Sequence, residues 1–350
     1  MSGIKIAFGT GGFGRGFDTV EAVEEIYTIL ESHKVKILDT ATLYAGSEEL
    51  IGKTKGGSRF IIDTKSPNGV FGHAGGKEGI VENFKKSRKD LGQDQVDIWY
   101  LHSPSKETPL EETLEAVNEA YKAGFFKRFG LSNFYAEEVQ RAYDICKAKY
   151  DFVPTVYQGN YNAVARKQET LLFPTLRKLG IAFYAYSPVA GGFLTKTKQD
   201  VLDGKGRFNP DTPIGKMYAG LYSRPAYLEA LAKWEAAAKE EGVTRAELAN
   251  RWVRFNSALK PEQGDAIIIG ASSTKQLKET LSTLDHGPLS DKAVKAINAI
   301  WEEIKHEAPL DNMNGANFFI ITSLTKPAHS WFHQRLWLDG NTEMAFPING

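Results

Sequence analysis

Cysteine is almost absent from this sequence of 350 residues, in which Cys146 is the only one. A single thiol excludes a framework of internal disulfides and suits a reducing compartment, so we expect a cytoplasmic protein. The segment around Cys146, VQRAYDICKAKY, has the spacing of an amphipathic helix. This spacing predicts a buried, unreactive thiol rather than a nucleophile.

The sequence also lacks an excess of charge and a long apolar run. Lysine plus arginine number 43 and aspartate plus glutamate number 43, so no net field attracts nucleic acid or an acidic membrane. No apolar stretch reaches the length of a transmembrane helix. The first residues, MSGIK, lack the apolar segment of a signal peptide. We therefore expect neither a nucleic-acid partner nor a membrane.

The histidines do not have the spacing of a metal site. The pair closest in sequence, His329 and His333, lacks the glutamate of the H-E-x-x-H motif. A metal-dependent barrel hydrolase is therefore poorly supported, and we expect no metal.

Short β-branched or aromatic runs alternate with helical patterns along the chain. The strand candidates are residues 4–8, 36–40, 60–64, 96–101, 126–131, 155–159, 181–187 and 266–270. The helical patterns cover residues 19–32, 46–53, 77–91, 109–123, 135–149, 168–179 and 225–256. Units in such strict alternation predict a parallel sheet with helices outside.

Because eight strands follow one another without a linker, a closed (β/α)8 barrel, the TIM-barrel fold, is favoured over an open sheet. We assign residues 1–309 to this barrel. Residues 188–224, after the seventh strand, form a glycine- and proline-punctuated insertion that is long enough to be a functional lid. Residues 310–350 lack clear periodicity and either pack across the barrel or are poorly ordered.

One helix has clear boundary signals. Thr108 is expected to cap it, Pro109 to occupy its first turn and Glu111 to complete a capping box. Gly124 is expected to end it.

Two glycine-rich segments imitate phosphate-binding loops. Residues 8–16, FGTGGFGRG, contain G-x-G-x-x-G, and Asp39 stands where a ribose-binding acid would follow. The next helix, however, begins only at Asp18 or Thr19, too late to present its N-terminus to a phosphate. Residues 46–54, GSEELIGKT, miss the spacing of a P-loop by one residue. We interpret the first segment as a mobile loop at the mouth of the first strand.

Polar side chains gather at the ends of three successive strand candidates. Asp39 ends the second, Tyr44 follows in its loop, Lys65 ends the third and His102 ends the fourth. A lone histidine or aspartate at such a place is often structural, but a lysine among apolar neighbours needs a carboxylate, and Asp39 lies one strand away. Because a barrel gathers the carboxyl ends of its strands on one face, we expect the four to meet there.

Together these groups make sense as a general acid and its supports. A nearby ammonium is expected to lower the pKa of the Tyr44 phenol toward a useful range, with Asp39 holding Lys65 in place. His102 could donate a hydrogen bond to a carbonyl oxygen. The phenol would then protonate a developing alkoxide, which forms when a hydride from a cofactor reaches a carbonyl carbon.

A cofactor site is indicated in the second half of the chain. Ser132, Asn133 and Gln158 at the ends of the fifth and sixth strands could bond a carboxamide, and Tyr186 offers a flat face for a nicotinamide ring. After the eighth strand, Gly270, Ala271, Ser272 and Ser273 lead into a helix whose N-terminus suits a phosphate.

These motifs, in order, resemble the aldo-keto reductase superfamily, and most closely its aflatoxin aldehyde reductase branch. The segments LDTATLY, YLHSP, TPLEETLEAV, FGLSNF, PTVYQGNYNA, YAYSPVAGGFLT, GRF and GDAIIIGASSTKQL carry the resemblance. It implies a barrel that binds NADPH, with Asp39, Tyr44, Lys65 and His102 as the catalytic tetrad. It also implies that His102 and Tyr218 face the substrate. The cofactor contacts that it implies are Ser132, Asn133, Gln158, Tyr186, Ser187, Pro188, Gly191, Gly192, Leu194, Arg207, Gly270, Ser272, Ser273, Gln276 and Thr280.

The chain departs from the family pattern at two informative places. Thr280 stands where the motif has asparagine, and Leu221 stands near Tyr218 where that branch carries an arginine for substrate carboxylates. We therefore expect neutral aldehydes, dicarbonyls or ketones as substrates of an NADPH-dependent reductase, in a protein that could form a homodimer. The alternative is an NADPH-binding regulatory or redox-sensing subunit with slow turnover.

Overall fold

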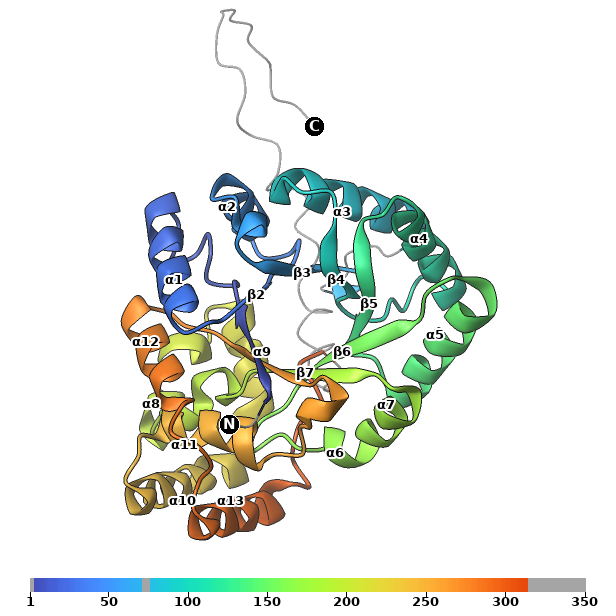
Figure 1. Cartoon of the computed structure of the whole chain (residues 1–350). Coiled ribbons are helices and arrows are strands. Elements are labelled where there is room, and N and C mark those ends of the chain that lie inside the picture. The colour runs from blue at the N-terminus through green and yellow to red at the C-terminus, as the bar shows by residue number, and fades with distance from the viewer. Residues whose placement is uncertain (1–2, 71–75, 314–350) are drawn as a thin grey trace, which may run out of the picture. The chain divides into compact units, whose positions relative to one another are not determined.

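The computed structural model describes residues 3–70 and 76–313. Eight parallel strands close into a barrel in which each strand pairs with the next in sequence and β8 returns to β1 (Figure 1). The helices lie around the strands, so the predicted (β/α)8 barrel is confirmed. The strands are β1 (Lys5–Gly9), β2 (Ile37–Asp39), β3 (Ile61–Ser66), β4 (Val96–Leu101), β5 (Phe126–Ser132), β6 (Pro154–Asn160), β7 (Ala182–Tyr186) and β8 (Ala266–Ile269).

The helices follow the strands in the predicted order. Those before β7 are α1 (Val20–Ser32), α2 (Ser47–Lys53), α3 (Gly76–Leu91), α4 (Leu110–Lys122), α5 (Ala136–Lys149), α6 (Gln168–Leu171) and α7 (Phe173–Leu179). Those after β7 are α8 (Lys198–Leu202), α9 (Pro213–Tyr222), α10 (Pro225–Glu241), α11 (Arg245–Arg251), α12 (Thr274–Thr283) and α13 (Asp291–Ile304).

Alternate residues of the strands face the two sides of the barrel wall. One set, which includes Ile37, Ile98 and Val156, forms a small buried cluster in the interior. The opposite set, which includes Trp99 and Phe183, joins the larger core beneath the helices. This alternation places every second side chain of a strand inside the barrel, so the last inward residues of each strand meet at its carboxyl end.

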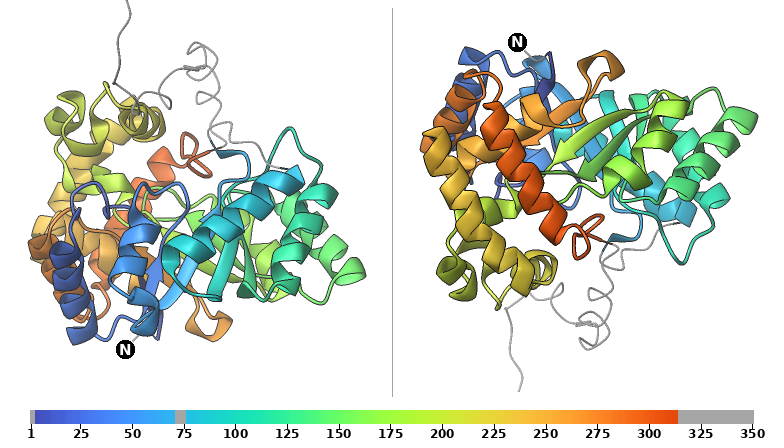
Figure 2. Two further views of the ribbon diagram at one scale, coloured as in Figure 1. Left: turned by 90° about the horizontal axis from the view of Figure 1, so that it is seen from above. Right: turned by 90° about the horizontal axis from the view of Figure 1, so that it is seen from below.

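The segment between β7 and α10 leaves the barrel wall and forms short helices. It contains the 3-10 turns η3 (Ala190–Thr195) and η4 (Gly206–Phe208) together with α8 and α9. Figure 2 shows this segment in yellow and the last described residues in orange-red at the same end of the barrel, opposite the N-terminus. The carboxyl ends of the strands open at that end, because β1 starts at the other.

Two predicted helices are interrupted. Residues 168–179 divide at Leu172 into α6 and α7. Residues 225–256 divide at Gly242, whose φ of 75° ends α10, and the chain then forms α11 and a π-helical turn, η5 (Trp252–Asn256). A left-handed glycine stops a helix even where the apolar spacing continues.

The predicted cap of the helix at 109–123 is wrong. Pro109, with ψ of 141°, is the N-cap residue of α4, and no side chain caps this end. The Thr108 backbone N–H instead donates to Ser105 Oγ at 3.1 Å, which holds Thr108 in the preceding loop. Gly124, with φ of 70°, lies just beyond the helix as expected.

The glycine-rich loop after β1 is packed against its surroundings. Thr19 caps α1 by accepting a hydrogen bond from the Ala22 N–H at 3.2 Å, so this helix starts as late as the sequence predicts. Phe13 is buried in the core, which anchors this part of the loop, and residues 14–16 are exposed. A Cβ on Gly14 would lie 2.1 Å from the Ala45 carbonyl oxygen, so glycine is needed for the loop to approach this segment.

Cys146 is buried in α5, where burial raises the pKa of its thiol to about 12. No helix within residues 3–70 and 76–313 is both long and apolar enough to cross a membrane. Of the predicted C-terminal extension, residues 310–313 are described, and Gln168 donates to the Leu310 carbonyl oxygen at 2.8 Å. His329 and His333 lie outside the described residues.

Candidate active site

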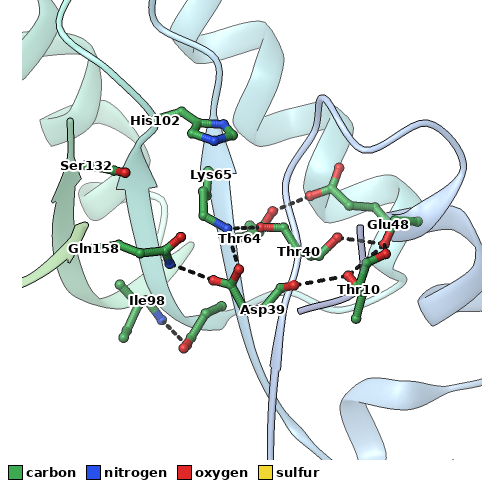
Figure 3. A network of polar contacts seen from close by, with 12 residues as sticks. Thr10, Asp39, Thr40, Glu48, Thr64, Lys65, Ile98, His102, Ser132 and Gln158 are labelled. Atoms are coloured by element: carbon green, nitrogen blue, oxygen red, sulfur yellow. Dashed lines mark hydrogen bonds and ion pairs between the residues drawn. The ribbon is translucent and has the colours of Figure 1, made fainter. Parts of the chain in front are cut away.

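The centre of the site is a buried ion pair between β2 and β3. Lys65 Nζ donates to Asp39 Oδ2 at 2.7 Å and to the Thr40 carbonyl oxygen at 2.7 Å (Figure 3). The side chain of Lys65 is 0% exposed and that of Asp39 is 4% exposed. The expected contact between them is therefore present, and it explains how an ammonium can be buried in the barrel.

Tyr44 and His102 lie around the ammonium of Lys65. The Lys65 Nζ atom is 5.2 Å from the centroid of the Tyr44 ring. The ring centroids of Tyr44 and His102 are 6.1 Å apart, and the rings are nearly perpendicular, at 79°. The structure thus brings together the four polar residues that the sequence places at successive strand ends.

Buried hydroxyl groups fix the backbone that carries Asp39 and Tyr44. Ser47 Oγ lies 2.8 Å from Thr10 Oγ1 and 2.9 Å from Thr40 Oγ1. Thr10 Oγ1 also donates to the Asp39 carbonyl oxygen at 3.1 Å (Figure 3). The Ser47 N–H donates to the Tyr44 carbonyl oxygen at 2.9 Å, where α2 begins. The first two strands and α2 are therefore tied together directly behind the site.

His102 is neutral in this environment. Burial, helped by the charge of Lys65, lowers the pKa of its imidazole to about 3. Its Nδ1 atom is buried and has no hydrogen-bond partner among the described residues. At neutral pH this side chain can therefore offer a hydrogen bond but cannot supply a proton as an imidazolium.

The pKa of Tyr44 is shifted in the direction opposite to our expectation. Burial raises the pKa of the phenol above its usual value, and the opposing effect of the Lys65 ammonium does not cancel the rise. Burial alone would lower the pKa of Lys65, but the charges of Asp39 and Tyr44 raise it overall. Lys65 thus remains charged, and its effect on the phenol offsets part of the cost of burial.

The predicted carboxamide contacts are linked to His102 and Asp39. Asn133 donates through Nδ2 to the His102 carbonyl oxygen at 2.8 Å and to Ser132 Oγ at 3.0 Å. Gln158 donates through Nε2 to Asp39 Oδ1 at 2.8 Å (Figure 3). Tyr186 donates to Asn133 Oδ1 at 2.9 Å. Two hydrogen-bonded groups therefore connect these strand ends, one joining β6 to β2 and the other joining β7 and β5 to His102.

The predicted cofactor loop follows β7 directly. Among Ser187, Pro188, Gly191, Gly192 and Leu194, the two glycines have φ of 66° and 100°, and Leu194 is buried. A Cβ on Gly191 would lie 1.9 Å from the Tyr218 ring, so this turn is shaped to admit that ring.

Tyr218, on α9, joins this loop to Arg207. Its hydroxyl group lies 3.5 Å from Ser187 Oγ and accepts a hydrogen bond from Arg207 at 3.3 Å. The charges of Tyr218 and Arg207 both act on the Tyr44 phenol. The segment after β7 therefore reaches the same mouth of the barrel as the four central residues.

The predicted phosphate site and the cofactor contacts that the resemblance implies beside it lie after β8. Gly270 follows the strand, and Ser273 caps α12 by accepting a hydrogen bond from the Gln276 N–H at 3.2 Å. Gln276 Oε1 accepts hydrogen bonds from the Ser272 N–H at 2.8 Å and hydroxyl at 2.9 Å. Thr280 lies one turn further along α12. These residues form an exposed helix N-terminus with hydroxyl groups at its tip.

Asp63 is a buried acid next to Lys65 that was not predicted as a site residue. Asp63 lies on β3, two residues before Lys65, and its side chain is fully buried. The segment FIIDTK carries the signal, since residues two apart on a strand face the same side.

The fold, together with the group of Asp39, Tyr44, Lys65 and His102, defines a (β/α)8-barrel protein with a polar site at the carboxyl ends of its strands. Residues 5–302 match the model of the Aldo/keto reductase family, so the chain belongs to that family and is an oxidoreductase. Among residues 3–70 and 76–313, no three or more His, Cys, Asp or Glu side chains are grouped so as to hold a metal ion.

Curated relatives match most of the chain. Oxidoreductase sirO of Leptosphaeria maculans is 39% identical over 87% of this chain and 95% of its own. The human aldo-keto reductase family 7 member A3 is 39% identical over 85% of this chain and 93% of its own. The human aflatoxin B1 aldehyde reductase member 2 is 38% identical over 87% of this chain and 89% of its own.

Proposed function

We propose that this oxidoreductase uses NADPH to reduce aldehydes and reactive dicarbonyls to alcohols, with Tyr44 as the proton donor. The observation that carries the proposal is the buried Asp39–Lys65 pair at 2.7 Å with the Tyr44 ring 5.2 Å from its ammonium. The name of the human aflatoxin B1 aldehyde reductase, a relative at 38% identity, supports aldehydes as the substrate class.

The donor set around the barrel mouth fits a nicotinamide dinucleotide. Ser132, Asn133 and Gln158 present amide and hydroxyl groups that match a carboxamide, and Tyr186 adds an aromatic face beside them. The N-terminus of α12, with Ser272 and Ser273, provides donors for an anionic group. NADPH, when bound, supplies the hydride.

The residues of the chain handle the carbonyl oxygen and the proton. His102, neutral because its pKa is lowered to about 3, donates a hydrogen bond to the carbonyl oxygen through its ring N–H. Tyr44 holds the proton that the developing alkoxide receives, and its raised pKa keeps it protonated at neutral pH. Lys65 stabilises the phenolate that remains, and Asp39 keeps Lys65 charged and oriented.

The surroundings of Tyr218 favour neutral carbonyl substrates. Leu221 is buried one turn away on α9, and the family resemblance implies an arginine for substrate carboxylates near this place. We therefore propose aldehydes, dicarbonyls and ketones without a carboxylate as the preferred substrates.

The test is NADPH consumption with a panel of aldehydes, dicarbonyls and aromatic ketones. Tyr44→Phe should abolish reduction while NADPH still binds, because the phenyl ring keeps the shape and loses the proton. Tyr143→Phe on the outer helix α5 serves as the matched control and should be fully active. Equal turnover by Tyr44→Phe contradicts the mechanism. NADPH binding by the wild type without consumption would instead favour a regulatory or redox-sensing subunit.

A further inference from the structure

Asp63 is a third carboxyl group beside the site, and the proposed mechanism does not use it. It is paired in register with Asp39 on β2 and with Ile98 on β4. Its Oδ1 accepts the Ile98 N–H at 3.2 Å, a contact that is drawn in Figure 3. Its Oδ2 is buried and has no hydrogen-bond partner among the described residues. Half of this carboxyl group is therefore left without a donor inside the barrel.

The cations near Asp63 are already paired with other carboxylates. Lys65 holds Asp39 at 2.7 Å, and Arg128 on β5 donates to Asp97 Oδ2 at 2.6 Å. An ionised Asp63 would therefore be a third carboxylate for two cations. Like charges on facing strands in a buried site cannot both ionise without a large cost, so one of the carboxyl groups keeps a proton. Asp63 is the one that lacks a cation.

The remaining neighbours of Asp63 do not supply the missing charge. Tyr100 on β4 and Tyr184 on β7 interact with it electrostatically. A Cβ on Gly130 would lie 2.2 Å from the Tyr100 ring, so the bare glycine makes room for this ring. Burial, with the charges of Asp39 and Asp97, raises the pKa of Asp63 well above its usual value, and Arg128 opposes the rise only in part. Arg128 and the Ile98 N–H favour the ionised form, but burial and the two carboxylates outweigh them, so the surroundings as a whole favour a protonated Asp63.

We propose that Asp63 is a positioning residue that acts through Lys65 by remaining neutral. With Asp63 neutral, Lys65 faces a single carboxylate, Asp39, and part of its field remains to stabilise the Tyr44 phenolate. Ionisation of Asp63 would place a second negative charge beneath the ammonium and make Tyr44 a weaker acid. This role rests on the proposed function of Tyr44, whereas the protonation of Asp63 does not.

The protonation of Asp63 is tested on the protein alone, without cofactor. The unfolding equilibrium of the wild type and of Asp63→Asn is measured in urea from about pH 5 to about pH 9. A proton that the folded state keeps and the unfolded chain releases makes the wild-type unfolding constant rise up to tenfold per pH unit relative to the variant. Asp94→Asn, on a side chain 95% exposed, is the matched control and should not change the slope. Parallel curves for the wild type and Asp63→Asn overturn the proposal.

A second variant covers the case in which Asp63→Asn does not fold. Asp63→Val is close in size and also removes the titration. Valine leaves the Ile98 N–H without the acceptor that asparagine would keep, so Asp63→Val should have a lower unfolding free energy than a folded Asp63→Asn at every pH. The test compares how steeply the unfolding constant changes with pH, and not its value at any one pH. A destabilised variant is therefore still informative.

The effect on Tyr44 is tested by the pH dependence of aldehyde reduction. Asp63 is neutral at neutral pH, but in the wild type its ionisation at alkaline pH would place a second negative charge near Lys65. Asp63→Asn cannot ionise, so Tyr44 should be the stronger acid in the variant at alkaline pH. The pH at which kcat falls should then be lower than in the wild type, by roughly half a unit to one unit. If Asp63 had only a structural role, Asp63→Asn would lower kcat at every pH, and the pH at which kcat falls would stay the same. An unchanged pH of this fall overturns the proposed action of Asp63 through Lys65. If the wild type reduces no aldehyde, the proposed function fails, while the unfolding experiment still decides the protonation of Asp63.

Discussion

Gln158 and Lys65 share the carboxylate of Asp39. Gln158 Nε2 donates to Oδ1 at 2.8 Å, while Lys65 Nζ donates to Oδ2 at 2.7 Å. Since β2 and β6 are not neighbours in the barrel, this contact runs across its interior. Asp39 therefore anchors both the proposed proton-donating side of the site and the side proposed to bind a carboxamide.

Replacing this anchor should affect stability and activity together. Asp39→Asn leaves the Lys65 ammonium buried without its counter-charge, and breaking such a pair costs about 3–5 kcal/mol of unfolding free energy. We expect kcat for aldehyde reduction to fall by about 100-fold or more, because the Lys65 charge is no longer secured. Urea unfolding and steady-state kinetics measure the two effects.

A double variant separates the two effects of Asp39. Asp39→Asn combined with Lys65→Met removes both charges and should recover part of the lost stability but none of the activity. Recovery of activity in the double variant would contradict the role of Lys65.

The neutral state of His102 has a consequence below neutral pH. Its pKa of about 3 in the folded protein lies below the usual value, so the unfolded chain binds a proton that the folded protein does not. Stability should therefore fall as the pH decreases through the usual range of histidine. Between about pH 7 and about pH 5 this group accounts for about 2 kcal/mol, which His102→Gln should abolish. His306→Gln, at an exposed side chain, controls for the effect of replacing a histidine with glutamine. Identical pH slopes for the wild type and His102→Gln would show that this histidine is protonated normally.

The turn after β7 depends on a glycine next to Tyr218. Gly191→Ala places a methyl group 1.9 Å from the Tyr218 ring at a residue with φ of 66°. The backbone strain alone costs about 1–2 kcal/mol, and the displaced ring should raise the KM for NADPH. Gly220→Ala, with nothing within 4 Å of the added atom, is the control and should be neutral or slightly stabilising. Urea unfolding and NADPH titration compare the two variants. Equal stability and equal NADPH affinity of Gly191→Ala and Gly220→Ala would contradict the need for glycine at position 191.

Arg207 should favour NADPH over NADH. Its guanidinium donates a hydrogen bond to the Tyr218 hydroxyl at 3.3 Å in the segment that follows β7. The 2'-phosphate, which NADPH carries and NADH lacks, would gain a charge-assisted hydrogen bond from this guanidinium. Arg207→Ala should weaken NADPH binding by roughly tenfold to 100-fold and change NADH binding little. Lys205→Ala removes an equal charge from a nearby side chain that is paired with Asp200 and serves as the control. Tryptophan fluorescence titration of the wild type and the two variants measures the affinity of each for NADPH and for NADH. An equal loss of NADPH and NADH affinity in Arg207→Ala contradicts the role of Arg207.

The barrel could be predicted because its strands are short apolar runs in strict alternation with helices. The interruption at Leu172 could not, because the apolar spacing continues across it. The break at Gly242 does have a sequence signal, since this glycine is followed by Thr244, which caps the next helix. The cap at Thr108 failed for a local reason, since Ser105 engages the Thr108 backbone N–H in the preceding loop. Helix boundaries depend on such contacts, which composition does not show.

The central residues of the site could be predicted from their places on parallel strands. Asp39, Lys65 and His102 end neighbouring strands, and a barrel brings these ends to one face. The bond of Gln158 to Asp39 could not be predicted, because it depends on which strands face each other across the interior. The direction of the Tyr44 pKa shift also required the structure, since burial outweighs the ammonium there.

The missing side chain at Gly130 limits how this part of the barrel can vary in evolution. The Tyr100 ring occupies the volume that even one methyl group at position 130 would need, with its Cδ1 atom 2.2 Å from that place. A larger residue at 130 therefore demands a smaller one at 100, and a smaller residue at 100 alone would leave a void beside Asp63. We expect these two positions to covary among related chains.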